Sequence, residues 1–227
     1  MPRAWVASLL LAAGKRASGR HLVLLDAAIG HVTLGRWLQR RGIRRVHRVK
    51  SREDLFALAL SSLRGRRPLY VELGVHRGDS IRWWATHLHD PDASFNGFDS
   101  FVGLPEMWNA ENAAGRFSTA GEVPASDDPR VRFFPGWFDQ TLPAYDPPLH
   151  DVAFINFDAD LYSSTITALH ELRPLITAGT WLYFDELNDK DHELRALDEF
   201  LEETKIEVSA VARAANGRHW LFRVDRI

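Results

Sequence analysis

The sequence predicts an α/β fold in which helices cover a mostly parallel β-sheet. Short apolar runs alternate with helical stretches from residue 68 to residue 204, a pattern typical of strands joined by crossover helices. Two further apolar runs close the chain on either side of Asn216-Gly217, a pair that favours a tight type I′ hairpin turn. The length of 227 residues fits one domain with a small appendage.

The predicted strands are short apolar runs, whereas the predicted helices repeat their apolar residues every three or four positions. In the helix predicted over 79–89, Ile81, Trp84 and Leu88 share one face. The other helices are predicted over 161–173 and 191–204, and the strands over 68–74, 95–101, 131–138, 152–158, 180–186, 206–214 and 218–225.

Parallel strands followed by an antiparallel hairpin predict a Rossmann-like fold, with a seven-stranded, mostly parallel sheet and one reversed strand. This is the architecture of class I methyltransferases. A generic doubly wound fold with a hairpin at its edge is the alternative. The chain contains no cysteine, which excludes disulfides, zinc-thiolate sites, iron–sulfur clusters and cysteine nucleophiles.

Residues 1–66 are predicted to form a helical, basic extension or lid ahead of the Rossmann-like domain over 67–227. Ser51 and Asp54 have the spacing of a capping box at the start of a helix. Residues 1–70 carry fifteen Lys and Arg and three Asp and Glu, a net charge of +12, and the rest of the chain has a net charge of −14. Such a basic arm binds nucleic acid, anionic lipid or an acidic substrate, or it folds onto its own acidic body or a neighbouring subunit's.

The start of the chain also has the outline of a short signal peptide, with Arg3 followed by an apolar run over 4–13. A second apolar stretch after Lys15 and Arg16 favours paired amphipathic helices instead, and these are candidates for contacts in a homo-oligomer. No apolar run reaches about 18 residues, so we expect no membrane span and a cytoplasmic protein.

The first candidate site is the turn after the first predicted strand, YVELGVHRGDS. Glu72, Gly74 and Gly78 match the methyltransferase pattern E-x-G-x-G-x-G, with His76 in place of the central glycine. Glycines allow a ligand to approach the backbone, and the helix that begins near Ser80 offers free N–H groups. An ordinary structural turn is the alternative for this motif taken alone.

Acidic residues follow the other predicted strands. Asp99 follows the second strand, where a carboxylate can accept hydrogen bonds from ribose hydroxyls. The other carboxylates are Asp158 and Asp160 after one strand and Asp185 and Glu186 after the next. Because parallel strands end at one edge of the sheet, we expect Asp158, Asp185 and Glu186 to hold Mg²⁺. The alternative is that they cap helices or pair with the basic arm.

Five motifs in order resemble the macrocin-type family of S-adenosylmethionine (AdoMet)-dependent O-methyltransferases: ELGVHRGDS, GFDSFVGLPE, FFPGWFDQTLP, NFDADLYSST and LITAGTWLYFDEL. They span about half of the chain, from Glu72 to Glu186. The chain has Asp185-Glu186 where the family usually has two aspartates, and its segment between Leu104 and Val123 indicates a less characterised branch. The resemblance implies a class I fold, AdoMet as cofactor and a small-molecule hydroxyl as acceptor, on a sugar or a related natural product.

The resemblance also implies roles for single residues. Those expected at the methionine end of AdoMet are Glu72, Gly74, Gly78 and Ser80. Those expected around the ribose and adenine are Asp99, Ser100, Phe101, Gly136 and Trp137. Asp158, Asp185 and Glu186 are implied as the metal ligands.

Methyl transfer requires alignment and removal of the hydroxyl proton. Asp158 is the first candidate base, with Asp160 and His192 as weaker ones. Two other functions stay open: an RNA methyltransferase guided by the basic arm, and a non-catalytic AdoMet-binding protein. The sequence lacks the N/D-P-P-Y/F signature of amino-group methylation after a strand, which weighs against the first.

Overall fold

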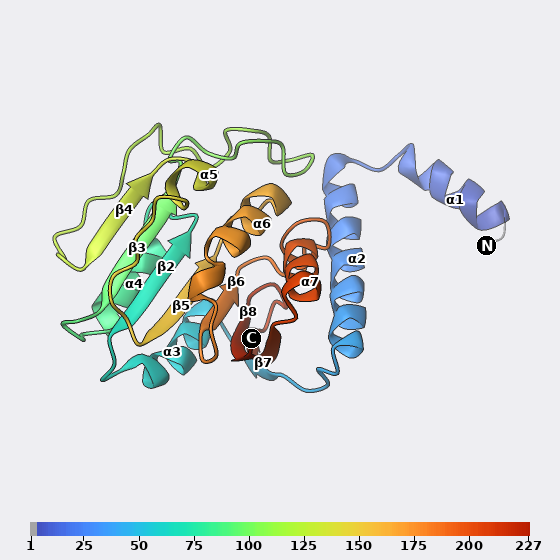
Figure 1. The fold of residues 1–227 in the computed structure, drawn as a ribbon. Coiled ribbons are helices and arrows are strands. Elements are labelled where there is room, and N and C mark those ends of the chain that lie inside the picture. Colours follow the sequence, from blue (N-terminus) through green and yellow to red (C-terminus); the bar gives the residue numbers. More distant parts are fainter. Residues whose placement is uncertain (1–3) are drawn as a thin grey trace.

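The structure is a computed structural model that describes residues 4–227, so Arg3 of the signal-peptide outline lies outside the described residues. Its core is one eight-stranded sheet in the order β1-β7-β8-β6-β5-β2-β3-β4 (Figure 1). The strands are β1 (His47–Val49), β2 (Pro68–Leu73), β3 (Ser94–Asp99), β4 (Val131–Pro135), β5 (Val152–Phe157), β6 (Trp181–Phe184), β7 (Glu207–Ala214) and β8 (Trp220–Arg226).

The pairing confirms the predicted fold class. Within residues 4–227, β8 alone runs antiparallel to its neighbours, β6 and β7, and every other pair of neighbouring strands is parallel. The sheet has one strand more than the seven predicted, because β1 joins its edge beside β7. The carboxyl ends of β2, β3, β5 and β6 therefore share one edge with the amino end of β8.

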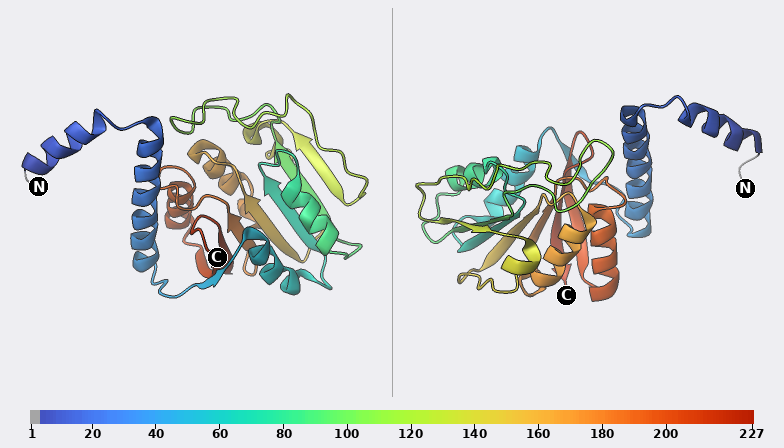
Figure 2. Two further views of the ribbon diagram at one scale, coloured as in Figure 1. Left: turned by 180° about the vertical axis from the view of Figure 1, so that it is seen from behind. Right: turned by 90° about the horizontal axis from the view of Figure 1, so that it is seen from above.

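Helices cover both faces of the sheet (Figures 1 and 2). One core cluster packs the sheet against α2, α6 and α7, and the other packs it against α3 and α4. The helices are α1 (Ala4–Gly14), α2 (Gly19–Arg40), α3 (Arg52–Leu63), α4 (Asp79–His87), α5 (Phe138–Thr141), α6 (Tyr162–Glu171) and α7 (Glu193–Thr204).

The N-terminal helices differ in how they meet this body. Leu34 and Trp37 of α2 are buried, and the Trp37 indole N–H donates to Asp198 of α7 over 2.7 Å. The guanidinium of Arg41 pairs with Asp198 at 2.7 Å and with Glu202 at 3.0 Å. This part of the basic arm thus lies on the chain's own acidic surface.

By contrast, α1 extends away from the body (Figures 1 and 2). Its leucines Leu9, Leu10 and Leu11 are exposed. Among residues 4–227, no helix has the length and apolar character that crossing a membrane requires.

Two elements of the predicted extension belong to the layers of the sheet. The capping box of α3 is confirmed: Asp54 N–H donates to Ser51 Oγ, and Ser51 N–H donates to Asp54 Oδ2. The apolar face of α3 is buried, with Phe56 against Phe154 of β5. The division into 1–66 and 67–227 stays a prediction, and β1 and α3 pack with the residues that follow them.

The hairpin between β7 and β8 is present, but its predicted type I′ turn is wrong. Gly217 has a φ of +75°, whereas Asn216 does not adopt the positive φ that a type I′ turn requires. Gly217 N–H donates to Ala214 O, and Ala214 N–H donates to His219 O, so the connection spans residues 215–218. This wider turn leaves Arg218 and His219 at the edge of the sheet where the predicted site lies.

Candidate active site

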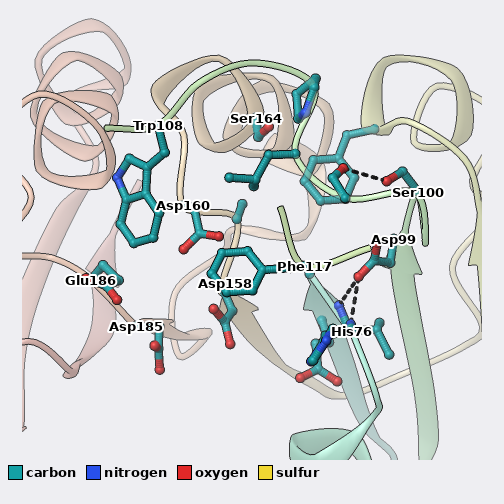
Figure 3. A pocket seen from close by; sticks show the side chains of 18 of the residues that line it. His76, Asp99, Ser100, Trp108, Phe117, Asp158, Asp160, Ser164, Asp185 and Glu186 are labelled. Carbon is teal, nitrogen blue, oxygen red and sulfur yellow. Dashed lines mark hydrogen bonds between the residues drawn. The ribbon is translucent and has the colours of Figure 1, made fainter. Parts of the chain in front are cut away.

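A cavity of about 670 Å³ opens at the carboxyl edge of the parallel strands. Figure 3 shows two groups of side chains around it, with Asp99 and His76 on one side and the four carboxylates Asp158, Asp160, Asp185 and Glu186 on the other. Of the predicted site residues, those that line the cavity are Glu72, Gly74, Ser80, Asp99, Ser100, Gly136, Trp137, Asp158, Asp160, Asp185 and Glu186. Gly78 and Phe101 are not among the lining residues.

The glycine turn after β2 is shaped by a close approach of two backbones. Gly74 has a φ of +94°, and a Cβ at this position would lie 1.8 Å from the carbonyl oxygen of Asp158. Gly78 has a φ of +76° and caps α4. Both glycines are therefore required by the conformation of the chain, and Gly74 also by the contact between the ends of β2 and β5.

Asp99 holds this turn in place. Its Oδ2 accepts hydrogen bonds from the N–H groups of Val75 and His76 at 2.8 and 2.7 Å (Figure 3). Its Oδ1 accepts one from Phe101 N–H at 2.7 Å. Three backbone donors thus share the carboxylate expected to bind ribose. Ribose binding stays a prediction, and the structure adds a role for Asp99 in positioning the turn.

Glu72 presents a buried acid to the cavity. Its Oε1 accepts a hydrogen bond from Asn156 Nδ2 at 3.1 Å, whereas its buried Oε2 has no partner among the described residues. Burial raises the pKa of Glu72 to about 8. A buried carboxyl with an unused oxygen fits a cationic ligand group such as the ammonium of an amino acid.

The opposite wall of this half comes from the ends of β3 and β4. Ser100 Oγ donates to Gly103 O, which closes a tight turn, and Gly136 and Trp137 lie after β4. The ring of Phe101 is buried and packs edge-on against Phe133. The expected place of Phe101 beside an adenosine stays a prediction, and its backbone N–H, bonded to Asp99, rather than its buried ring is the part of the residue nearest to the turn.

Asp158 and Asp160 face the centre of the cavity (Figure 3). Burial, followed by the charges of Asp185 and Asp160, raises the pKa of Asp158 well above its ordinary value. Burial and then the charge of Asp185 raise the pKa of Asp160 to about 7. A carboxylate with a raised pKa is the stronger base, so both groups are candidates for the base, and Asp160 is suited to accept a proton near neutral pH.

The weaker base candidate, His192, has another task. Its Nδ1 accepts the backbone N–H of Tyr162 at 3.0 Å, at the start of α6, and the residue does not line the cavity. His192 thus satisfies a helix N-terminus.

The predicted metal ligands do not form a common site. Asp185 Oδ1 accepts a hydrogen bond from Tyr183 OH at 2.6 Å and lies 3.0 Å from His219 Nδ1, and Glu186 forms an ion pair with Arg218. Although burial raises the pKa of Asp185, the His219 and Tyr183 contacts outweigh it and leave that pKa below its ordinary value.

In the part of the chain that the structure describes, no group of three or more His, Asp or Glu side chains is placed to hold a metal ion. Asp158, Asp185 and Glu186 therefore do not fit Mg²⁺ as arranged, because Glu186 is paired with the Arg218 guanidinium and Asp185 is held by Tyr183 and His219. The metal set of Asp158, Asp185 and Glu186 stays a prediction from the sequence.

A long segment between β3 and β4 covers the cavity. Trp108 Nε1 donates to Asp189 Oδ2 over 2.8 Å, and Ser163 Oγ donates to Glu106 Oε1 over 2.6 Å, so the segment is tied to the loop after β6 and to the first turn of α6. Trp108 and Phe117 of this segment line the cavity. Sequence reasoning did not single out these aromatic residues, and it also missed Arg52, Arg218 and His219.

Comparison with known proteins agrees with the fold. A solved structure titled as the O-methyltransferase NovP superposes with a TM-score of 0.62 at 23% identity, covering 77% of this chain and 80% of that one. An O-methyltransferase from Bacillus cereus in complex with SAH superposes with a TM-score of 0.50 at 17% identity, covering 86% and 91%. The fold is therefore that of the class I O-methyltransferases.

The family follows from the sequence match. The model of the macrocin-O-methyltransferase (TylF) family matches residues 65–220, and the chain belongs to this family. It is 34% identical over 136 residues to a tetracenomycin rhamnosyl 4′-O-methyltransferase of Streptomyces olivaceus, covering 51% of each chain. It is 32% identical over 170 residues to the demethyldecarbamoylnovobiocin O-methyltransferase of Streptomyces niveus, covering 66% of this chain and 64% of that one. The chain thus spans about half to two thirds of the length of these relatives.

Proposed function

We propose that this protein is an AdoMet-dependent O-methyltransferase whose acceptor is a hydroxyl group on a small molecule, a sugar or a related natural product. The observation that carries the proposal is that one cavity holds both a glycine turn with a buried acid, Glu72, and the carboxyls of Asp158 and Asp160, whose pKa values are raised. The family match, the relative named for methylating a rhamnosyl group, and the SAH complex of a structural neighbour support it.

The residues of the turn suit the amino-acid end of the cofactor. When bound, AdoMet supplies an electrophilic methyl group on a sulfonium centre. The unused Oε2 of Glu72 is suited to pair with its ammonium group, and the N-terminus of α4 to receive its carboxylate. Gly136 and Trp137 are proposed to border the adenine, and Asp99 and Ser100 the ribose.

The acceptor side is proposed to align and deprotonate the hydroxyl group. The acceptor oxygen forms a bond to the methyl carbon, the carbon–sulfur bond breaks with its electron pair left on sulfur, and the hydroxyl proton passes to Asp158 or Asp160. Trp108 and Phe117 offer flat apolar faces that suit a sugar ring or an aromatic group, and the segment that bears them limits access of water. No step in this proposal depends on a metal ion.

Calorimetric titration with AdoMet, followed by a methylation assay on glycosylated and phenolic acceptors, tests the proposal. We expect AdoMet binding in a one-to-one ratio and methyl transfer to at least one hydroxyl acceptor. AdoMet binding without methyl transfer to any acceptor in the panel would instead favour the non-catalytic AdoMet-binding protein.

The RNA methyltransferase alternative makes a different prediction for the basic arm. Because Arg41 is already paired with Asp198 and Glu202, we propose that the arm is a structural contact rather than an RNA clamp. Tight RNA binding that weakens steeply with salt would contradict this.

The exposed leucines of α1 support the proposal of a homo-oligomer formed through the N-terminal helices. Light scattering measures the mass of the particles formed by the full chain and by a variant without residues 1–17. A monomeric mass for both proteins would contradict the oligomer.

A further inference from the structure

The carboxylates after β6 meet two basic side chains at the start of β8, and strand register explains why. In the antiparallel pairing of β6 with β8, Phe184 lies opposite Trp220. The next residue after Phe184 is Asp185, and the residue before Trp220 is His219, so these two side chains are brought together. The ring Nδ1 of His219 lies 3.0 Å from Asp185 Oδ1 and 2.8 Å from the Asp185 carbonyl oxygen.

Arg218 continues this pairing by one position. Leu187 N–H donates to Arg218 O over 3.1 Å, which fixes the backbone of the turn beside the loop after β6. The Arg218 guanidinium forms an ion pair with Glu186, whose side chain is only 13% exposed. Arg218 also lines the cavity, so its remaining N–H groups are available on the acceptor side.

Further donors complete the charge compensation around Asp185. The guanidinium of Arg52, at the start of α3, lies 4.0 Å from Asp185 Oδ1, and Tyr183 OH donates to the same oxygen over 2.6 Å. A magnesium ion requires several oxygen ligands at about 2.0–2.1 Å in near-octahedral geometry. At this place it would have to displace Arg218 from Glu186 and stand close to Arg52.

We infer that the Arg218 guanidinium, with His219 beside it, takes the place of a divalent cation at Asp185 and Glu186, so that this enzyme transfers methyl groups without Mg²⁺. The inference rests on the proposed O-methyltransferase function. It also changes the substrate class. A metal ion binds two adjacent substrate oxygens, whereas a guanidinium donates hydrogen bonds and does not require a second oxygen. The enzyme therefore methylates acceptors with one isolated hydroxyl in addition to vicinal diols.

Metal binding is measured first, because it needs no acceptor. We titrate the full-length protein with Mn²⁺ alone and follow the free ion by electron paramagnetic resonance, then repeat the titration with Mg²⁺ in a calorimeter. Wild type is expected to bind neither ion at this site. The Arg218→Ala variant is expected to gain Mn²⁺ binding, since Glu186 then lacks its guanidinium partner and is free to join Asp158 and Asp185 as an oxygen ligand. Arg218→Ala/Asp185→Asn is expected to lose it again.

Turnover is measured next, in EDTA and in Mg²⁺. The wild-type rate is expected to be the same in both, whereas Arg218→Ala falls roughly tenfold to a hundredfold in EDTA and recovers in part with Mg²⁺. Arg218→Lys keeps the charge and is expected to retain part of the rate without metal. Arg223→Ala is the matched control, because Arg223 lies on β8, which follows the turn that bears Arg218, is exposed, and packs over the Trp181 ring away from the cavity.

Three results overturn the inference: stoichiometric Mn²⁺ binding by wild type that Asp185→Asn abolishes, loss of wild-type turnover in EDTA that Mg²⁺ restores, or an unchanged EDTA rate in a folded Arg218→Ala variant. If no acceptor is methylated under any condition, the proposed function fails, and the Mn²⁺ titration still decides whether the guanidinium replaces the cation.

Discussion

The two halves of the cavity are built in different ways. The half after β2 and β3 is made of backbone: a glycine turn whose N–H groups are gathered by one carboxylate, Asp99. The half after β5 and β6 is made of charged side chains, in which Asp185 and Glu186 meet His219 and Arg218. The glycine turn of the first half is a short run of sequence to which Asp99 reaches from 23 and 24 positions away, whereas the second half joins side chains more than thirty positions apart.

This difference explains which sequence predictions held. A turn that is defined by glycines and one acid can be recognised from a short motif, because backbone conformation depends on neighbouring residues. A cluster of carboxylates at a sheet edge can be recognised too, but its partners cannot. The parallel strands β3, β5 and β6 placed the acids correctly. The two residues just before the reversed strand β8 then supplied the basic partners that the spacing of the acids does not reveal.

The largest effect is expected where the two halves touch, at Gly74. In Gly74→Val the new Cβ would lie 1.8 Å from Asp158 O, at a φ of +94° that side chains rarely adopt. Overpacking and backbone strain together predict a loss of more than about 3 kcal/mol in the free energy of unfolding. Urea denaturation measures it. Gly35→Ala, in α2 with nothing within 4 Å, is the control and should be neutral or slightly stabilising.

The next effect concerns the base in the carboxylate half. Because the pKa of Asp160 is raised to about 7, a rate that depends on its carboxylate rises with pH from about 6 to 8. Asp160→Asn should remove this limb of the pH–rate profile, whereas Asp158→Asn should lower kcat by about a hundredfold at every pH. If Asp160→Asn keeps the whole profile and Asp158→Asn loses it, Asp158 alone is the base.

Glu72 gives a pH effect on stability in the backbone half. Its pKa is raised to about 8 in the folded protein, so its contribution to stability is complete below pH about 4.5 and is lost as pH rises to about 8. The thermal unfolding temperature of the ligand-free protein should therefore fall as pH rises over this range. The Glu72→Gln variant should show a flatter dependence and exceed wild type by a few kcal/mol near pH 8. Parallel curves for the two proteins would show that Glu72 ionises normally.

Asp99 tests whether the backbone half is held by one carboxylate. Asp99→Ala leaves the N–H groups of Val75, His76 and Phe101 without their acceptor. The loss should lower the free energy of unfolding by about 1.5–3 kcal/mol. AdoMet affinity should fall roughly tenfold or more in calorimetry. Asp99→Asn keeps one acceptor oxygen, so its AdoMet affinity should fall less. Equal affinity of wild type and Asp99→Ala would place the cofactor elsewhere.

The smallest effect is expected far from both halves, where α2 meets α7. Asp198→Ala removes the acceptor of Trp37 and the partner of Arg41 and should cost about 1–2 kcal/mol in denaturation. Arg40→Ala breaks only an exposed pair with the same carboxylate and should change stability by less than about 0.5 kcal/mol. An effect of Arg40→Ala as large as that of Asp198→Ala would mean that the basic arm is held by long-range charge.

The sequence by itself determined the fold class, the capping box of α3, the helices that cross over the sheet and the edge at which Asp99, Asp158 and Asp185 gather. These features depend on apolar periodicity, on glycine conformation and on the length of a single crossover, all of which are local. The motif residues Glu72 and Gly74 were found for the same reason.

Tertiary structure alone decided that His47–Val49 pairs with β7 as an eighth strand, that the ring of Phe101 is buried against Phe133, and that Arg218 and His219 face the acids after β6. Each of these outcomes depends on which strand lies beside which and in what register. A three-residue strand is too short to show an apolar periodicity in the sequence. The partner in an ion pair across an antiparallel ladder is the residue that the register places opposite, and spacing along one segment of the chain does not specify that residue.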